Sequence, residues 1–261
     1  MAEGDTIARA RLRLTPIFEG QAITEFWSKR LRGHKPRVGQ VITGVRSVGK
    51  HLLIDIENGL TLSTHMGMYG SWKAFEDGAL DPEARIRSSP YLRVIVATNL
   101  GYALCSKASK VESFVRTDQV TPISSLGPDL CVKGFDIDNV IARVRQLPKN
   151  TLLVECLLDQ KVACGIGNIF KSEALFAEKL TPFKTLDEVS DKQLGSLFLK
   201  AASMLQENSQ HGNQVRKTKP DGGFFVYKRW RLPCKVCGMA ISRSYQGEFS
   251  RSTYWCSTCQ T

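Results

Sequence analysis

The chain has 261 residues, of which 42% are hydrophobic, and its 36 Lys and Arg against 25 Asp and Glu give a formal net charge of +11. This length allows two domains with cores of their own, and the positive charge favours a polyanion as partner. Because no apolar run approaches the roughly 20 residues of a membrane-spanning helix and no secretory signal opens the chain, we expect a cytoplasmic protein without a membrane partner.

The N-terminal segment combines a short extended tip with a predicted helix from about Thr6 to Leu14, with Asp5 or Thr6 as N-cap. Since Ala2 is small, we expect the initiator methionine to be removed. The exposed α-amine has an ordinary pKa of about 7.7 to 8.0, so roughly a tenth of it is uncharged at neutral pH. With Glu3 beside it as proton donor, this amine can attack a sugar C1′ and form a Schiff base. The alternative is a frayed terminus with a solvated Glu3.

Residues 23–115 alternate apolar and polar positions between turn signals, which predicts an all-β sandwich or flattened barrel of about eight strands. The dipeptide Asn58-Gly59 marks one hairpin turn, and residues 99–101 mark a second.

Two features of this β region are candidates for function. Lys50 opens a strand directly after Gly49; it is either held inward or a solvated surface lysine. The stretch His65–Gly70 is loosened by glycines, which places Met68 and Tyr69 on a protruding turn. An exposed Met68 can act as a wedge between bases, or it can pack into the core.

Turn formers over residues 121–128 mark the domain boundary, after which the hydrophobic period becomes helical. Four helices are predicted within residues 135–147, 149–160, 168–180 and 187–210. The glycine-bearing turn 161–168 leads into the third helix, where backbone amides can bind a phosphate. Asn168 adds a side-chain donor and Lys171 a charge, although a generic helix-turn-helix contact explains the same residues.

The C-terminal part begins with a basic loop, residues 211–223, expected to be mobile near the substrate, and a predicted strand over 224–230. Two Cys-x-x-Cys pairs separated by 18 residues follow. They can hold one structural Zn²⁺ through four thiolates, with two disulfides as the alternative. The four ligands are Cys234, Cys237, Cys256 and Cys259. Arg243 and Arg251, between the pairs, suit phosphate contacts.

The remaining cysteines are scattered among apolar neighbours and are interpreted as reduced thiols. They are Cys105, Cys131, Cys156 and Cys164.

Several motifs occur in one order along the whole chain: Ala-Glu-Gly at the N-terminus, Gly-Lys-His-Leu-Leu, His-Met-Gly-Met-Tyr-Gly-Ser-Trp, Gly-Ile-Gly-Asn-Ile-Phe-Lys-Ser-Glu, and Arg-Ser-Thr-Tyr-Trp-Cys-x-x-Cys-Gln. This order resembles the formamidopyrimidine-DNA glycosylase and endonuclease VIII family of base-excision repair enzymes. The resemblance implies an α+β multidomain fold, with an N-terminal β-sandwich, a helix-two-turn-helix domain and a C-terminal four-cysteine zinc finger that close around damaged double-stranded DNA.

The resemblance also implies roles for residues. Ala2 takes the place of the nucleophile and Glu3 that of the acid. Lys50 assists proton transfer and contacts phosphate, while Asn168 and Arg251 grip phosphates beside the lesion. Met68 fills the gap left by the extruded base. The implied chemistry is cleavage of the N-glycosidic bond through a Schiff base, followed by β,δ-elimination.

Two departures from the family pattern matter. The family usually has proline where this chain has Ala2, whose imine must be protonated before it acts as an electron sink, so we expect a working but slower lyase. Residues 104–114 lack the Asp-Pro-Arg-Arg-Phe-Gly element that supplies two more gap-filling residues in the oxoguanine branch. Both this absence and the short loop before the finger favour the endonuclease VIII branch and oxidised pyrimidines.

The expected organisation is a catalytic β-sandwich domain with its helix at 1–120, a linker at 121–130, a helix-two-turn-helix domain at 131–223 and a zinc finger at 224–261. We expect a monomer, associated with the nucleoid if the source is bacterial. The alternative function is a non-catalytic paralogue that binds damaged or abasic DNA. A zinc-ribbon transcription or RNA-binding protein is more remote, because it leaves the N-terminal features unexplained.

Overall fold

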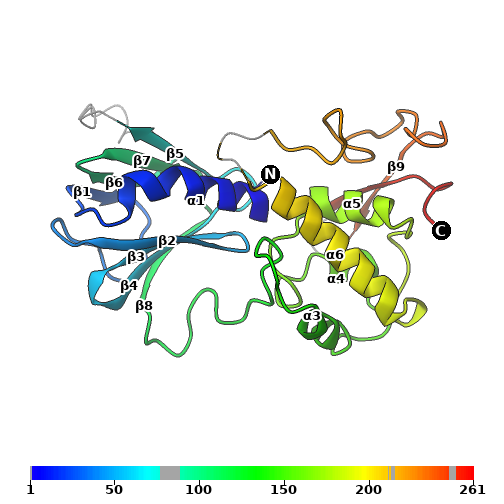
Figure 1. The fold of residues 1–261 in the computed structure, drawn as a ribbon, viewed down its shortest axis with the longest axis horizontal. Helices are drawn as coiled ribbons and strands as arrows, with labels where there is room; N and C mark the ends of the chain where they lie inside the picture. The colour runs from blue at the N-terminus through cyan, green and yellow to red at the C-terminus, as the bar shows by residue number, and fades with distance from the viewer. Residues whose placement is uncertain (1, 77–88, 211, 213–214, 247–250) are drawn as a thin grey trace. The chain divides into compact units, whose positions relative to one another are not determined.

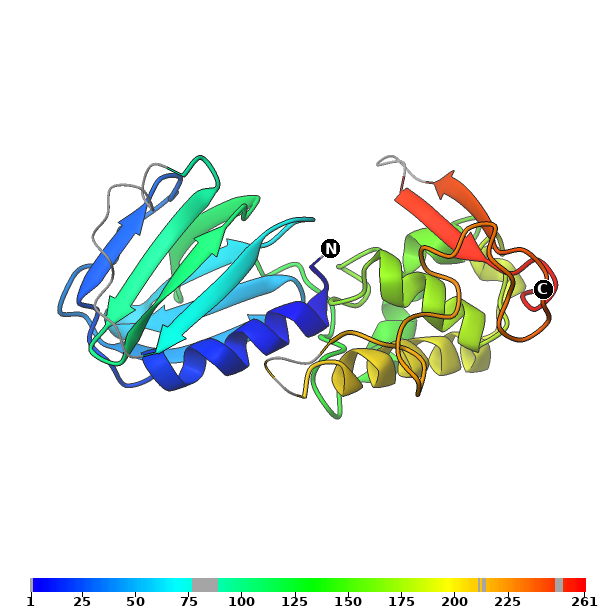
Figure 2. The same ribbon diagram turned by 90° about the horizontal axis from the view of Figure 1, so that it is seen from above.

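The computed structural model describes residues 2–76, 89–210, 212, 215–246 and 251–261. The chain divides into two compact units: unit 1 runs up to Ser125 and includes Gly212, and unit 2 covers Leu126–Gln210 and the described residues from 215 onward. Unit 1 consists of strands and one long helix, while unit 2 consists of helices and a two-stranded hairpin (Figures 1 and 2). Within the described ranges, no helix has both the length and the apolar character that a bilayer span requires.

Helix α1, Gly4–Phe18, extends beyond the predicted helix at both ends. The carbonyl of Glu3 accepts the N–H of Ile7 at 3.3 Å, so the N-cap is Glu3, and the expected N-cap at Asp5 or Thr6 was wrong. The helix buries an apolar stripe at intervals of three and four residues, as an amphipathic helix on a core does. This stripe consists of Ile7, Ala10, Leu14, Ile17 and Phe18.

Unit 1 is a sandwich of two four-stranded antiparallel sheets, with the strand orders β2-β3-β4-β8 and β1-β6-β7-β5. The strands are β1 (Glu25–Ser28), β2 (Ile42–Val48), β3 (His51–Ile56), β4 (Leu60–His65), β5 (Ser71–Glu76), β6 (Leu92–Thr98), β7 (Gly101–Ser106) and β8 (Lys110–Val115). The predicted β-sandwich is thereby confirmed, and both predicted hairpin turns join consecutive strands. Asn58 and Gly59 adopt φ values of 60° and 79°, the left-handed region that this dipeptide tolerates well.

The core of unit 1 lies between the two sheets and under α1. Helix α1 packs against β2 and β3 of one sheet and against β5, β6 and β7 of the other. Inward residues of both sheets join the apolar stripe of the helix in one cluster, among them Leu52 and Ile54 from β3 and Val94 and Val96 from β6. The long helix is therefore held along its length, which fixes where its first residues lie.

Unit 2 contains α3 (Ile137–Val144), α4 (Leu153–Cys156), α5 (Asn168–Ala177) and α6 (Asp191–Glu207), together with a short 3-10 turn at Leu186–Glu188. A similar 3-10 turn in unit 1 covers Glu57–Gly59. All four helices lie within the predicted segments, although α4 is only four residues long. Helix α3 is capped by the Asp136 side chain, and α6 by a capping box between Ser190 and Gln193. Their apolar faces share one core.

The finger of unit 2 is the antiparallel hairpin of β9 (Ser242–Gln246) and β10 (Arg251–Trp255). The predicted strand at 224–230 was wrong, because this segment forms turns. Backbone N–H groups of Phe225 and Tyr227 donate to one carboxylate, that of Glu173, each at 2.8 Å, which bends the chain around that side chain.

Candidate functional site

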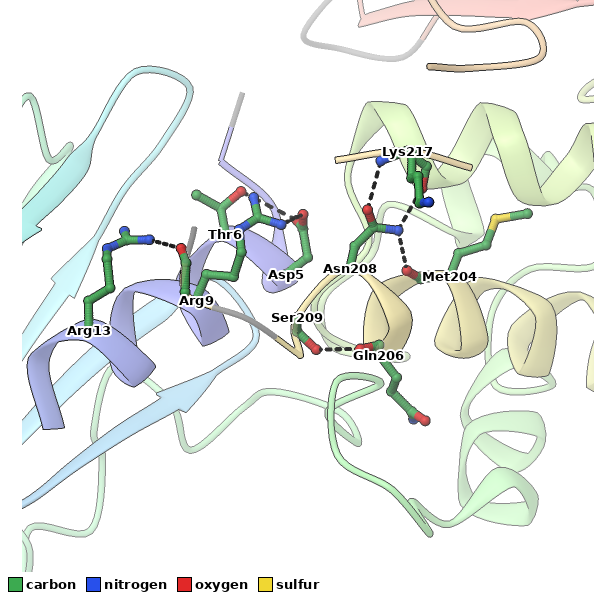
Figure 3. A network of polar contacts seen from close by, with 10 residues as sticks. Asp5, Thr6, Arg9, Arg13, Met204, Gln206, Asn208, Ser209 and Lys217 are labelled. Atoms are coloured by element: carbon green, nitrogen blue, oxygen red, sulfur yellow. Dashed lines mark hydrogen bonds and ion pairs between the residues drawn. The ribbon is translucent and has the colours of Figure 1, made fainter. Parts of the chain in front are cut away.

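The N-terminal tip is packed into unit 1. Ala2 is 6% exposed and Glu3 is 0% exposed, so the alternative of a frayed terminus with a solvated Glu3 does not fit. Two residues after Glu3, Asp5 forms an ion pair with Arg9, one helical turn along α1, at 2.9 Å (Figure 3). A buried carboxyl group directly after a small residue is what an amine nucleophile with a local proton donor needs.

The fold brings Lys50 to the end of unit 1 at which α1 begins. Residues 20 and 21, just after α1, exchange backbone hydrogen bonds of 2.9 Å with Ile42 at the start of β2. Strand β2 then packs along α1, and the two elements have similar lengths, about 22 Å for the helix and about 23 Å for the strand. The turn that holds Lys50 therefore lies at the same end as residues 2 and 3.

The turn Met66–Gly70 follows β4 at this end of the unit. It is closed by a backbone hydrogen bond of 2.9 Å from Gly70 to the first carbonyl of the turn, and a Cβ on Gly70 would lie 2.4 Å from that oxygen. Gly67 adopts φ +58°, which also favours glycine. Met68 is 50% exposed and Tyr69 is 73% exposed. Of the two interpretations of Met68, the structure favours the protruding one.

Two histidines beside this turn escaped the sequence analysis. His51 and His65 are directly paired across β3 and β4, with ring centroids 4.8 Å apart. Nδ1 of His65 lies 2.9 Å from the hydroxyl of Ser109, and Nδ1 of His51 lies 3.3 Å from the hydroxyl of Ser63. Burial, aided by the charges of His65 and Lys110, lowers the pKa of His51 to about 4. His51 is therefore neutral at physiological pH. This state depends on the pairing of β3 with β4, which the sequence alone does not show.

In unit 2, the start of α5 is joined to β10 by side chains. Asn168 is 2% exposed; its Nδ2 donates to the carbonyl of Ser252 at 2.8 Å, and its Oδ1 accepts from the ammonium of Lys171 at 2.9 Å. The same ammonium donates to Oγ1 of Thr253 at 2.8 Å. Because Lys171 is 0% exposed, its charge holds α5 against β10 in this structure, and a direct contact with DNA stays a prediction.

Arg251 is the first residue of β10 and precedes Ser252, the partner of Asn168. The structure thus brings Asn168, Lys171 and Arg251 together at the start of α5. The helix N-terminus there carries backbone N–H groups that favour an anion. Arg251 is only partly buried, which leaves it the more accessible of the two cations.

Hydrogen bonds of Asn208 hold the segment that leads to the finger. The side chain of Asn208, just after α6, donates to the carbonyls of Met204 and Lys217 at 2.8 and 2.7 Å and accepts the N–H of Lys217 at 2.8 Å (Figure 3). These bonds fix the chain where it leaves the helix domain. The side chain is 2% exposed, so the contacts are shielded from water.

The four predicted metal ligands converge. All four Sγ atoms lie within 4.8 Å of one another, with Cys234 and Cys259 at 3.9 Å and Cys237 and Cys256 at 3.4 Å. These cysteines are free thiols, so the disulfide alternative fails. Tetrahedral Zn²⁺ with Zn–S bonds of about 2.3 Å needs sulfurs about 3.8 Å apart, so the donor set fits one zinc ion.

The other cysteines are also free. Burial raises the pKa of Cys156 to about 12 and that of Cys105 further, which agrees with inert core thiols.

Comparison with known proteins agrees with this geometry. Residues 1–107 match the family model of the formamidopyrimidine-DNA glycosylase N-terminal domain, and residues 126–219 match that of the formamidopyrimidine-DNA glycosylase H2TH domain. The chain is 34% identical to a probable endonuclease 8 2 of Streptomyces coelicolor, over 100% of this chain and 94% of the relative. It is 31% identical to an endonuclease 8 of Salmonella arizonae, over the full length of both.

Solved structures share the fold. The MutM (Fpg) protein of Thermus thermophilus superposes with a TM-score of 0.81 and 26% identity, covering 99% of this chain and 98% of that one. Lactococcus lactis formamidopyrimidine DNA glycosylase, solved with DNA containing an AP site, has a TM-score of 0.81 and 21% identity over 100% of both chains. At that identity the second likeness shows the fold alone.

Proposed function

The chain belongs to the formamidopyrimidine-DNA glycosylase family, and we propose that it releases oxidised pyrimidines from DNA through a Schiff base on the amine of Ala2. With endonuclease 8 relatives over its full length, it is a base-excision repair enzyme that acts as a DNA glycosylase and an AP lyase. The observation that carries the proposed chemistry is the buried pair of Ala2 and Glu3 at the end of unit 1 that also holds Lys50.

The reaction begins when the uncharged α-amine of Ala2 attacks C1′ as the bond from C1′ to the base breaks, and the proton that the amine nitrogen loses leaves with the base. Glu3, as the acid, donates a proton to the ring oxygen, so that the sugar opens and the C1′=N bond forms. Loss of a C2′ proton then expels the 3′ phosphate, and a second elimination expels the 5′ phosphate. The covalent intermediate divides a difficult strand cleavage into several easier steps.

Other residues position the DNA in this proposal. Lys50 assists proton transfer and contacts phosphate, and Met68, held on its protruding turn, fills the space left by the extruded base. Asn168 and Arg251 contact phosphates beside the lesion. We assign Lys171 a positioning role, because its buried ammonium supports Asn168 and β10.

The proposed zinc ion is structural, since four thiolates leave no open position for a water or substrate. Cys234, Cys237, Cys256 and Cys259 would hold it and fix the base of the β9–β10 hairpin. When bound, zinc would supply a cross-link there, which the finger needs because the apolar cluster under it is small.

The preference for oxidised pyrimidines rests on the connection between β7 and β8. Only residues 107–109 join the two strands, and Lys107 adopts φ 55° in that tight turn. The connection has no room for the six-residue element of the oxoguanine branch. We further propose that the protein works as a monomer on damaged double-stranded DNA, at the nucleoid if the source is bacterial. Its proposed domains are 1–120, 131–223 and 224–261, with a linker at 121–130.

Borohydride trapping on duplexes with thymine glycol, dihydrouracil, oxoguanine or an abasic site tests the proposal. We expect a covalent adduct on the oxidised pyrimidines and the abasic site, formed more slowly than by a relative with an N-terminal proline. Glu3→Gln is expected to abolish base release and retain DNA binding. Adduct formation absent under conditions that trap the proline relative would favour the non-catalytic paralogue, and base release by Glu3→Gln would show that Glu3 is not the acid.

A further inference from the structure

Four side chains at the base of the finger form a stack of alternating charge and aromatic ring. The guanidinium carbon of Arg231 lies 4.2 Å from the centroid of the Trp230 ring, and that of Arg243 lies 4.0 Å from the same centroid. Arg243 also lies 5.2 Å from the ring centroid of Tyr245. We call these four residues the finger ladder. Arginine on an aromatic face keeps its N–H donors free at the edge of the guanidinium plane.

The finger ladder lies in a strongly basic stretch. Residues 222–246 contain no Asp or Glu, while their basic residues are Lys228, Arg229, Arg231, Lys235 and Arg243. Among the described residues, no carboxylate forms an ion pair with Arg231 or Arg243. Within the described ranges, the two guanidinium groups are thus held in place by aromatic rings and not by carboxylates.

The aromatic members are exposed, and the backbone is shaped to present them. Trp230 is 41% exposed and Tyr245 is 59% exposed. Lys228 and Arg231, on either side of Trp230, adopt φ values of 58° and 64°, a left-handed conformation that costs a non-glycine residue stability. Large exposed aromatics on a strained backbone are unusual for a surface that serves stability alone.

The finger ladder shares the β9–β10 hairpin with the predicted phosphate contacts of unit 2. Tyr245 is directly opposite Ser252 in the hairpin, and Ser252 is the residue whose carbonyl accepts from Asn168. Arg251 is the preceding residue on that strand. Because successive side chains of a strand point to opposite faces, Arg251 and Tyr245 lie on opposite faces of the β9–β10 hairpin, so the finger ladder and Arg251 are neighbours on one element.

We propose that the finger ladder binds an unpaired DNA strand that flanks the lesion. The edges of Arg231 and Arg243 bind successive phosphates, and the exposed ring of Tyr245 stacks on a base. A duplex offers phosphates but no free base faces, whereas stacking on aromatic rings is how proteins bind single strands without sequence preference. The inference rests on the proposed function in one respect, namely that the bound polymer is DNA. It involves no catalytic group.

The test measures fluorescence anisotropy of a short labelled oligothymidine and of an undamaged duplex of equal length, with base release from a lesion duplex as a separate assay. Tyr245→Ala and Arg243→Lys each keep the finger's buried core. We expect each to weaken oligothymidine binding by about 5- to 100-fold and to change duplex binding much less, and we expect Tyr245→Ala to leave base release unchanged. Lys228→Ala, which removes a basic neighbour outside the ladder, shows how much the loss of one nearby charge weakens oligothymidine binding without any change to the stack.

Arg243→Lys separates the stack from its charge, because lysine keeps the positive charge and loses the plane. Trp230→Ala removes the ring between Arg231 and Arg243, so its zinc content and melting temperature are measured to check that the finger stays folded. Oligothymidine binding that is unchanged in Tyr245→Ala and Arg243→Lys would overturn the proposal, as would equal weakening for duplex and single strand. A wild-type protein that fails borohydride trapping but shows this selectivity would refute only the proposed catalysis.

Discussion

The buried carboxylate of Glu173 on α5 accepts the backbone N–H of Tyr227 at 2.8 Å. It also accepts the N–H groups of Phe225 and Val226 at 2.8 Å and the hydroxyl of Thr218, and its side chain is 0% exposed. Hydrogen bonds to an ionised group are about twice as strong as neutral ones. One side chain therefore fixes the segment that carries the chain from the helices into the finger.

Replacing Glu173 by Gln is expected to destabilise unit 2 by about 2–4 kcal/mol. The amide turns one acceptor into a donor that faces backbone N–H groups, which leaves buried donors without acceptors. Thermal unfolding measures the loss. Glu155→Gln, an exposed position on α4, is the matched control and should change stability by less than about 0.5 kcal/mol. Equal melting temperatures for the two variants would show that Glu173 does not hold the segment.

Lys171→Met tests whether Lys171 only supports Asn168 and β10 or also contacts DNA. If the ammonium of Lys171 only joins Asn168 to β10, its loss should lower base release and leave the salt dependence of DNA binding unchanged, because no phosphate contact is removed. Arg251→Ala should instead lower the slope of log binding constant against log salt by about 0.9. A slope that falls equally in Lys171→Met would show that this lysine reaches DNA.

The sequence predicted the elements of this fold where local signals are strong. The Asn58-Gly59 turn, the alternating strands and the two Cys-x-x-Cys pairs each depend on neighbours within a few residues, and all three are confirmed. The strand predicted at 224–230 was wrong, because Glu173, about fifty residues away, takes the backbone donors that a sheet would have used.

Side-chain surroundings were harder to predict than elements. The position of Lys171, three residues after Asn168 at the start of a helix, predicted an exposed charge near a phosphate site. In the structure, its ammonium instead donates to Asn168 and Thr253. The pairing of His51 with His65 depends on the register of two strands, which turn length and burial set together. Such contacts join residues far apart in the chain, so no local pattern contains them.

His51 makes stability depend on pH. Its pKa is lowered to about 4 by burial and by His65 and Lys110, against about 6.5 in the unfolded chain, so the unfolded state binds the proton more readily between these values. Stability should be constant above about pH 7 and fall by roughly 1–3 kcal/mol as pH drops from 6.5 to 4. Urea unfolding at several pH values measures this.

His51→Gln should remove that part of the pH dependence, because glutamine does not titrate, while His34→Gln at an exposed position should retain it. An unchanged pH profile in His51→Gln would assign the effect to other groups.

Removal of the metal should disable the finger and spare the rest of the fold. The finger's own cluster is small, and structural zinc sites of this kind contribute about 10–16 kcal/mol of apparent binding free energy, so the hairpin needs the ion to stay folded. We expect one zinc ion per chain, and a chelator should release it with at least tenfold weaker DNA binding, while the helix signal in circular dichroism persists. Cys237→Ser should lose zinc as purified, and Cys131→Ser, outside the four ligands, should keep it. DNA binding that survives complete zinc release would show that the finger holds its form through β9, β10 and the contacts of Lys171 alone.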